Sequence, residues 1–213
     1  MALDPELVAP GRTAIVVNEM QRGVVGDRAS LPMLVEAAAP AVAATGELVR
    51  VGRAAGVEVV HCVAANRVDA KGGMQNTVFA ARARKAAQEH PPRQEDVAAF
   101  SEVVPEISVA PSDIVLPRLH SMSPFTDTGL DMILRNLGVS TVVAAGVSLN
   151  IGVFGLVIEA VNRAYDVVLV TDACAGVPIE YGRMVVDHSL GLLARRTTVA
   201  ELSAIWSATA LGS

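Results

Sequence analysis

Short apolar runs alternate along the chain with longer stretches in which apolar residues recur at helical spacing. The runs predict six strands, at residues 13–18, 57–63, 113–117, 141–147, 166–171 and 197–200. Each run is almost entirely apolar, as expected for parallel strands whose two faces are both covered by helices. The pattern therefore predicts an α/β protein, a three-layer α/β/α sandwich with a mostly parallel six-stranded sheet of the Rossmann-like kind.

Helical spacing of apolar positions marks four segments between the strands, residues 32–55, 127–137, 152–164 and 179–195. A weaker final helix is expected over "ELSAIWSATA", near the end of the sequence. In the second of these helices, Thr126 or Asp127 is expected to cap the start, and Gly138 to end it.

Residues 64–112 differ from the rest, because they mix Gly, Pro and charged residues without a strand pattern. A connection this long in a compact domain is usually functional, so the segment is expected to be a lid or an oligomer contact. Its "ARARKAAQEH" cluster is interpreted as the solvated face of a short helix. The whole chain, residues 1–213, is expected to form a single domain.

Composition narrows the classes of partner. The formal net charge is -5 and aromatic residues make up 3% of the chain, so neither a phosphate-binding basic surface nor a base-stacking platform is expected, and nucleic acid is excluded as a partner. No run of about 20 apolar residues predicts a membrane span. The N-terminus lacks the pattern of a secretory signal, which indicates a cytoplasmic protein. Cys62 and Cys174 stand in apolar contexts without paired spacing and are expected to be inert buried thiols.

Polar and glycine residues follow the carboxyl ends of the first four predicted strands, which is where sheets of this type bind ligands. Because these ends meet at one edge of the sheet, a carboxylate, a guanidinium, an imidazole and several backbone amides are expected to converge there. The residues are Asn18, Glu19 and Gln21, then Asn66 and Arg67, then Arg118 and His120, and finally Ser148, Asn150 and Gly152.

Three segments together carry a family resemblance: "TAIVVNEMQRGVV", "VLPRLHSMSPFTDTGLDMILRNLGVSTVVAAGVSLNIGV" and "AVNRAYDVVLVTDACAG". In order and spacing they resemble the isochorismatase-like hydrolase superfamily, which includes nicotinamidase-type cysteine hydrolases and isochorismatases. The resemblance implies a small-molecule substrate, no cofactor, a homodimer or homotetramer, and a cis peptide between Val147 and Ser148.

The chain departs from the cysteine-hydrolase pattern at three positions. Glu19 stands at the position of the acidic residue, where the usual Asp is one methylene shorter. Arg118 replaces the expected lysine, or the lysine position is displaced by one residue. Gly152 stands where the cysteine nucleophile is expected. A glycine cannot attack a carbonyl, so thioester chemistry is excluded. Isochorismatases also carry glycine at this turn, and the resemblance implies their reaction, in which a carboxylic acid protonates an enol-ether carbon.

On this reading Glu19, Arg118 and His120 are the catalytic candidates, as acid or base, anion binder and proton shuttle. The residues expected to line the substrate site are Gln21, Asn66, Arg67, Phe125, Ser148, Asn150 and Gly152. No metal site is expected, because His61 and His120 lack the pattern of metal-binding relatives. The absence of Gly-x-Gly-x-x-Gly after the first strand argues against a nucleotide-binding oxidoreductase.

Two questions stay open at this level. Glu19 either is protonated and acts as an acid, which requires burial to raise its pKa, or stays ionised and acts as a base on water. A nearby Arg118 would favour the ionised form. The three unusual positions also fit a catalytically inactive relative that binds a small ligand or serves as a partner subunit.

Overall fold

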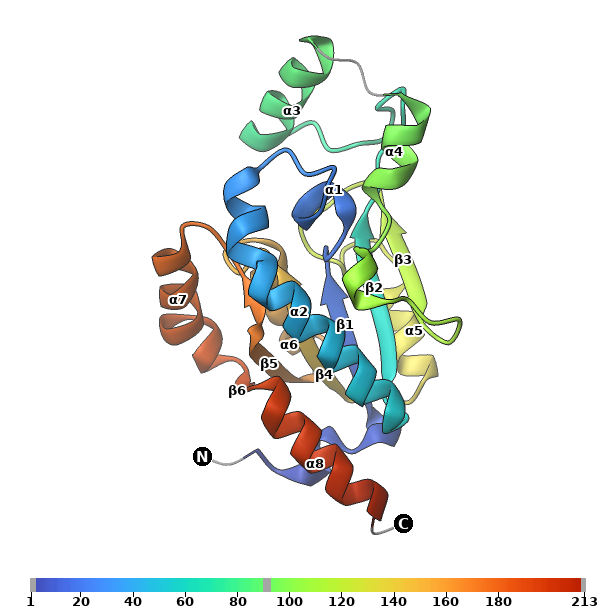
Figure 1. Ribbon diagram of the computed structural model, residues 1–213, viewed down its shortest axis with the longest axis vertical. Coiled ribbons are helices and arrows are strands. Elements are labelled where there is room, and N and C mark those ends of the chain that lie inside the picture. The colour runs from blue at the N-terminus through green and yellow to red at the C-terminus, as the bar shows by residue number, and fades with distance from the viewer. Residues whose placement is uncertain (1–2, 90–92, 212–213) are drawn as a thin grey trace.

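A single parallel sheet forms the centre of the computed structural model, which describes residues 3–89 and 93–211 (Figure 1). Its strands lie in the order β3-β2-β1-β4-β5-β6, and every neighbouring pair is parallel. Their bounds are β1 Thr13–Asn18, β2 Glu58–Ala64, β3 Ile114–Arg118, β4 Thr141–Val147, β5 Asp166–Ala175 and β6 Arg195–Thr197. The predicted fold class is confirmed, and the first five predicted strands begin within one residue of the observed ones.

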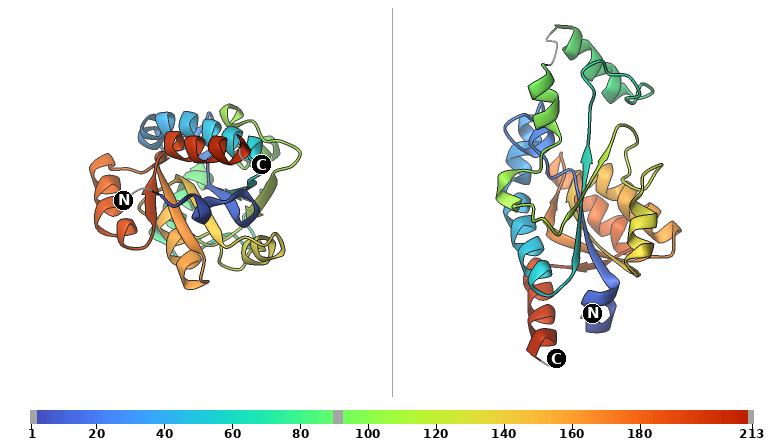
Figure 2. Two further views of the ribbon diagram at one scale, coloured as in Figure 1. Left: turned by 90° about the horizontal axis from the view of Figure 1, so that it is seen from below. Right: turned by 90° about the vertical axis from the view of Figure 1, so that its right-hand side faces the viewer.

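Helices cover both faces of the sheet, which gives three layers (Figure 2). On one face, α2 (Pro32–Ala54) and α8 (Val199–Leu211) pack against β1 and β5 and enclose one apolar core. On the other, α5 (Leu130–Asn136), α6 (Gly152–Asn162) and α7 (Ile179–His188) enclose a second. The remaining α-helices are α1 Arg22–Val25, α3 Val78–Glu89 and α4 Gln94–Phe100. The short 3-10 helices are η1 Pro5–Val8, η2 Pro10–Arg12, η3 Pro105–Ile107 and η4 Leu190–Leu192.

The prediction of a last strand at residues 197–200 is wrong in all but its first residue. β6 ends at Thr197, and α8 begins at Val199. The backbone N–H groups of Thr198 and Glu201 pair with the side chains of Glu201 and Thr198, respectively, and the Val199 N–H donates to the Asp172 carboxylate at 3.1 Å. This reciprocal Thr-x-x-Glu capping starts a helix in a sequence whose β-branched residues suggest a strand.

The predicted start of the helix over residues 127–137 is also wrong. Asp127 has a φ of 52°, a left-handed conformation that no helix can include, and the first helical residue is Leu130. The hydroxyl of Thr128, and not a side chain of Thr126 or Asp127, accepts from the Leu130 N–H at 3.2 Å. The end of the helix is as predicted, since Gly138 follows it with a φ of 72°.

Helix α2 corrects the view that nothing in the chain approaches a membrane span. By length and composition alone, Pro32–Ala54 is long and apolar enough to cross a membrane. In the structure it lies along the sheet and buries a face that includes Leu34, Ala38, Leu48 and Val49. Its apolar character therefore serves the core, as in other helices that cover parallel sheets.

The segment between β2 and β3 has only short helices. Along α3, residues 81–89 are all exposed, which confirms the predicted solvated helix face over that range, while the end of the predicted cluster, His90, lies outside the described residues. In both figures α3 stands apart from the sheet, beyond its carboxyl end (Figures 1 and 2). Whether the segment is a lid or an oligomer contact stays a prediction.

A buried polar cluster joins β2 to α2 and to the start of β3. His61 Nε2 lies 3.0 Å from Asp113 Oδ2, and the same carboxylate accepts from Arg53 Nε at 2.9 Å and from the Ala110 N–H at 3.0 Å. Burial lowers the pKa of His61 below its ordinary value despite the neighbouring carboxylate. Although burial alone would raise it, the pKa of Asp113 is lowered by the hydrogen bonds from Arg53, Ala110 and His61. His61 is thus a neutral core residue, as a histidine in an apolar strand usually is.

This cluster predicts a loss of stability on mild acidification. Since the folded-state pKa of His61 lies below the ordinary 6.5, the unfolded chain binds more protons between those two values, and stability falls as the pH drops through about 6.5. Urea midpoints measured from pH 7.5 to pH 5 are expected to decrease in the wild type and to decrease less in His61→Gln. His120→Gln is the matched control, because His120 is exposed. Equal pH slopes in wild type and His61→Gln would contradict this assignment.

Candidate active site

The carboxyl edge of the sheet brings Glu19 and Arg118 together. Glu19 directly follows β1 and Arg118 ends β3, so the arginine reaches across β2 to form an ion pair with the carboxylate, from Nη2 to Oε1. The side chain of Arg118 is 3% exposed and that of Glu19 is 20% exposed. Two of the three predicted catalytic residues therefore form one partly shielded pair.

The backbone aims the Glu19 side chain out of the strand. Glu19 has a φ of 55°, in the left-handed region that non-glycine residues seldom occupy, while its N–H still donates to Cys62 O at 2.8 Å. Such conformations persist where the surrounding structure holds them, and they concentrate at functional sites. The turn at Glu19 is fixed by β2 on one side and by the buried Met20 on the other.

Burial controls the ionisation of Glu19. Loss of solvation raises the pKa of this carboxyl above its ordinary value, and the charge and hydrogen bond of Arg118 oppose that rise only in part. A raised pKa enlarges the protonated fraction near neutral pH, which is the requirement for a general acid. The two opposing effects expected from the sequence are both present, and burial is the larger one.

One nitrogen of the Arg118 guanidinium lacks a hydrogen-bond partner among the described residues. Its Nε lies 3.4 Å from the carbonyl oxygen of Ser121 and its Nη2 binds Glu19, whereas the buried Nη1 has no hydrogen-bond partner within residues 3–89 and 93–211. An unpaired buried donor on a guanidinium is costly. Nη1 is also shielded from solvent, so a ligand oxygen reaches it only if neighbouring groups move.

The glycine turn lies at the end of the neighbouring strand β4. The peptide between Val147 and Ser148 is cis, as the resemblance implied, and the Ser148 hydroxyl bonds to Asn150 Oδ1. The turn leads into α6, whose first residue is Gly152, and the Ser148 carbonyl accepts from the Val153 N–H at 3.0 Å. Ser148 and Asn150 are half-buried, and Gly152 is buried.

The other predicted site residues differ in their exposure from the ion pair at the carboxyl edge of the sheet. His120, Asn66 and Arg67 are exposed, and Arg67 pairs with Asp69 at 2.8 Å. Phe125 belongs to the apolar core between the sheet and α6, where its ring centroid is 5.9 Å from that of Tyr165. The core position of Phe125 corrects the expectation that it lines a substrate site, because packing leaves its ring 2% exposed.

The side chain of Gln21 joins backbone segments through hydrogen bonds. Its side chain is fully buried, donates to the carbonyl oxygens of Ala64 and Phe100 at 2.9 and 2.8 Å, and accepts from the Ala64 N–H at 2.7 Å. These bonds tie the residues after β1 to the end of β2 and to α4. With its donors committed to the backbone, Gln21 supports the wall of the site and does not line it, which corrects the predicted role.

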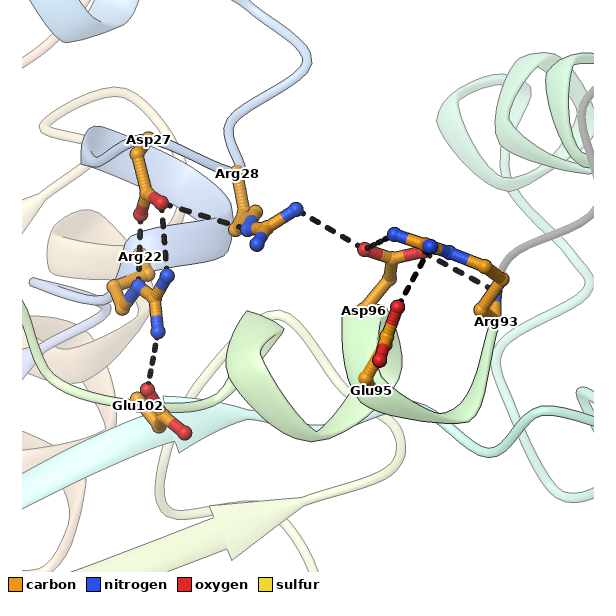
Figure 3. A network of polar contacts seen from close by, with 7 residues as sticks. All are labelled: Arg22, Asp27, Arg28, Arg93, Glu95, Asp96 and Glu102. Carbon is orange, nitrogen blue, oxygen red and sulfur yellow. Dashed lines mark hydrogen bonds and ion pairs between the residues drawn. The ribbon is translucent and has the colours of Figure 1, made fainter.

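A chain of ion pairs on the surface reinforces the same junction (Figure 3). Arg22 binds Asp27 at 2.8 Å and Glu102 at 2.5 Å, and from there the contacts run through Arg28 to Asp96 on α4 at 3.1 Å. The pKa of Asp27 is lowered by its hydrogen bond to Arg22. Exposed pairs add little stability one by one, and together these contacts join α4 and Glu102 to the residues of α1 and the turn that follows it.

Neither cysteine provides a nucleophile at this site. Burial raises the pKa of the Cys62 thiol and of the Cys174 thiol to about 12 each, and both side chains are buried. The interpretation of both as inert thiols agrees with these values, since a thiol with such a pKa is scarcely ionised near neutrality. Within residues 3–89 and 93–211, no three His, Cys, Asp or Glu side chains are grouped to hold a metal ion.

Two surface cavities lie away from the Glu19–Arg118 pair. A groove of about 970 Å³ runs along α2 and is lined by Val42, Gly46, Arg50 and Ile107, among others. A smaller one of about 290 Å³ lies at the end of β5 beside α7, next to Leu149 and Cys174. Neither is lined by Glu19, Arg118 or Gly152.

Comparison with known proteins places the chain in a family. A family model described as the isochorismatase domain matches residues 13–201, which spans the sheet, the Glu19–Arg118 pair and the glycine turn. The chain belongs to the isochorismatase family. At that level it is an isochorismatase-family hydrolase, and the resemblance inferred from the sequence is confirmed.

Individual relatives of this isochorismatase-family chain share about a quarter of its residues. The ureidoacrylate amidohydrolase RutB of Azorhizobium caulinodans is 28% identical over 188 residues, which cover 84% of this chain and 82% of that protein. An isochorismatase family protein from Burkholderia thailandensis superposes with a TM-score of 0.77 at 26% identity, covering 97% of this chain and 98% of that one. N-carbamoylsarcosine amidase from Thermoplasma acidophilum gives a TM-score of 0.67 at 25% identity, covering 88% and 96%.

Two groups that take part in the site, Asn18 and the Ser121 carbonyl, are not among the site residues predicted from the sequence. Asn18 was placed near it but not included among the site residues, although a polar side chain at the end of an otherwise apolar strand is a usable signal. The Ser121 carbonyl, which supports Arg118, had no such signal, because backbone groups of a loop become partners only through the fold.

Proposed function

We propose that the protein hydrolyses a small carboxylate-bearing substrate by carboxyl acid–base catalysis at Glu19, without a side-chain nucleophile on the glycine turn. The observation that supports this most directly is the half-shielded Glu19 carboxyl with a raised pKa, paired with the buried Arg118. A residue of this kind in a shielded site is a candidate general acid.

The proposed reaction begins with binding of the substrate carboxylate to Arg118. The anion takes up the free Nη1 donor and neutralises the guanidinium, which removes the main force that lowers the pKa of Glu19. Protonated Glu19 then delivers its proton to the electron-rich carbon of an enol ether, and an oxocarbenium ion forms. Water adds to that ion and loses a proton to the Glu19 carboxylate, which restores the acid, and the resulting hemiketal breaks down to a keto acid and an alcohol.

A carboxamide-type substrate is the second class within the same proposal. The names of two relatives, ureidoacrylate amidohydrolase and N-carbamoylsarcosine amidase, denote hydrolysis of C–N bonds. In this chain such a reaction would need ionised Glu19 to activate water as a general base, since residue 152 has no thiol. The raised pKa of Glu19 favours the enol-ether class, because that reaction uses the protonated carboxyl group.

The experiment that tests the proposal is a substrate screen with product identification. Isochorismate, simple enol-ether carboxylates, ureido acids and N-carbamoyl amino acids are each incubated with the protein from pH 5 to pH 9, and products are identified by mass spectrometry. Turnover of an enol ether whose rate falls with rising pH is expected. No turnover of any compound, or turnover that Glu19→Gln leaves unchanged, would contradict the proposal.

A ligand-binding protein without turnover is the other candidate, and one observation favours it. Glu19 and Arg118 are already paired with each other, as charges in a purely structural ion pair would be. Calorimetry on the same compounds separates the two. Binding of a carboxylate that is released chemically unchanged indicates the non-catalytic function, whereas binding followed by product formation indicates the hydrolase.

A further inference from the structure

The first residue of α6 has no room for a side chain. A Cβ atom built on Gly152 would lie 2.4 Å from Asn18 Nδ2, 3.5 Å from Asn18 Cγ and 3.1 Å from the Val147 carbonyl oxygen. The first of these distances is shorter than a non-bonded carbon–nitrogen contact allows. Gly152 is not required by its backbone conformation, because it is absent from the positive-φ glycines. It is required by the side chain that faces it.

That side chain, Asn18, is held in place from several directions. It is fully buried at the end of β1, and its Nδ2 donates to Val147 O at 2.5 Å. The register pairs Asn18 with Gly146, where a Cβ would meet the Asn18 carbonyl oxygen at 2.1 Å. The two strands thus approach each other closely at this point, and rotating the carboxamide away would leave the Val147 carbonyl buried without its donor.

Hydrogen bonds within the protein satisfy only one of the two polar atoms of the Asn18 carboxamide. Its Oδ1 is buried and has no hydrogen-bond partner in the parts of the chain that the structure describes. A polar residue that leaves one atom unsatisfied at the end of an apolar strand carries a cost that an apolar residue would avoid. Asn18 packs against the glycine turn, and this contact gives a structural reason for an asparagine at position 18.

We infer that the Asn18 carboxamide occupies the space of the side chain at position 152, so that an asparagine at 18 and any side chain at 152 exclude each other. Asn18 is then a positioning residue: it fixes the Val147 carbonyl, and with it the turn, and keeps the turn free of a nucleophile. The absence of a thiol at this turn then depends on two residues, Asn18 at the end of β1 and Gly152 at the start of α6. The inference does not depend on which substrate the protein takes, or on whether it has activity.

The inference predicts that a cysteine fits at position 152 without distortion only when position 18 is also substituted. With Asn18 in place, Gly152→Cys forces either the carboxamide or the start of α6 to move. With a small residue at 18, the new side chain can enter the vacated space, which is buried, so its thiol is expected to be protected from alkylation. Cys62 and Cys174 serve as internal standards, because both thiols are buried and have a pKa of about 12.

The test is a set of urea midpoints and iodoacetamide rates for G152C in three backgrounds: wild type, N18A and N18L. N18A removes the carboxamide, whereas N18L keeps its volume and removes its hydrogen bond. G152C is expected to lower the urea midpoint strongly in the wild-type and N18L backgrounds and at least threefold less in N18A. The thiol at 152 is expected to react at least tenfold more slowly in N18A/G152C, where it fits inside the fold, than in G152C alone, as read by intact mass.

Additive effects would overturn the inference. If G152C lowers the midpoint equally in all three backgrounds, or if its thiol reacts equally fast with and without Asn18, the two positions do not exclude each other. N18S, which is small and keeps a donor for the Val147 carbonyl, provides a second background in which the same comparison holds should N18A fold poorly. The labelling rate is the readout that a merely structural role of Asn18 would not change.

Discussion

Replacing Glu19 by Gln is expected to lower kcat by about 10²- to 10⁴-fold, which is the range that general acid–base groups contribute. Glutamine has nearly the same shape and can still accept from Arg118, but it has no proton to deliver at any working pH. Substrate binding is expected to change little, so the loss falls on kcat and not on KM. The rate is measured with the best substrate from the screen.

The matched control is Glu159→Gln, the same change on another carboxylate. Glu159 lies on α6, where it accepts from Thr126 at 2.5 Å and pairs with Arg163, the residue after the helix, at 3.2 Å. That variant is expected to keep its activity within a factor of a few. Similar losses in both variants would indicate a general effect on the fold, and retention of activity in Glu19→Gln would remove Glu19 from the reaction.

Replacing Arg118 by Leu is expected to act in two ways at once. The substrate carboxylate loses a charged donor, so kcat/KM should fall by about ten- to a hundredfold. The pKa of Glu19 should rise further, because burial already raises it and the group that lowers it is gone. The limb of the pH–rate profile that falls with rising pH is therefore expected to move to higher pH in this variant.

Arg118→Lys separates charge from geometry. Lysine keeps the positive charge, and so should keep the pH profile near that of the wild type, but it lacks the planar arrangement of donors that contacts Glu19 and Ser121 O together. The account would be contradicted if Arg118→Leu shifted the falling limb to lower pH, or if it left both kcat/KM and the pH profile unchanged.

Much of the architecture could be predicted from the pattern of apolar residues. Strands such as β1 and β4 are completely buried, so their sequences are continuous apolar runs that stand out. The edge strand β6 is Arg195–Thr197, with two exposed residues of three, and offers no such run. Its misplacement follows from that, and the capping box at Thr198 and Glu201 is the signal that would have corrected it.

The site was predictable only in part, and for a physical reason. The carboxyl ends of parallel strands meet at one edge of the sheet, which is why Glu19 and Arg118 could be assigned to the same site from the sequence, although β2 lies between their strands. The sequence does not state which way a loop side chain turns: Asn66 and Arg67 follow β2 as expected but face solvent, and Gln21 turns inward to bind backbone. The Asn18–Gly152 contact joins the end of β1 to the start of α6, and only coordinates reveal it.

The pKa of Glu19 in the folded protein is the quantity on which the account depends most. It can be measured by following the carboxyl carbon resonance of ¹³C-labelled protein through a pH titration, with Glu19→Gln identifying the signal. The account predicts a midpoint clearly above the ordinary 4.5, as burial requires, and a further upward shift in Arg118→Leu. A midpoint at or below 4.5 would mean that Arg118 dominates and Glu19 is fully ionised near neutral pH, which would contradict its assignment as the acid.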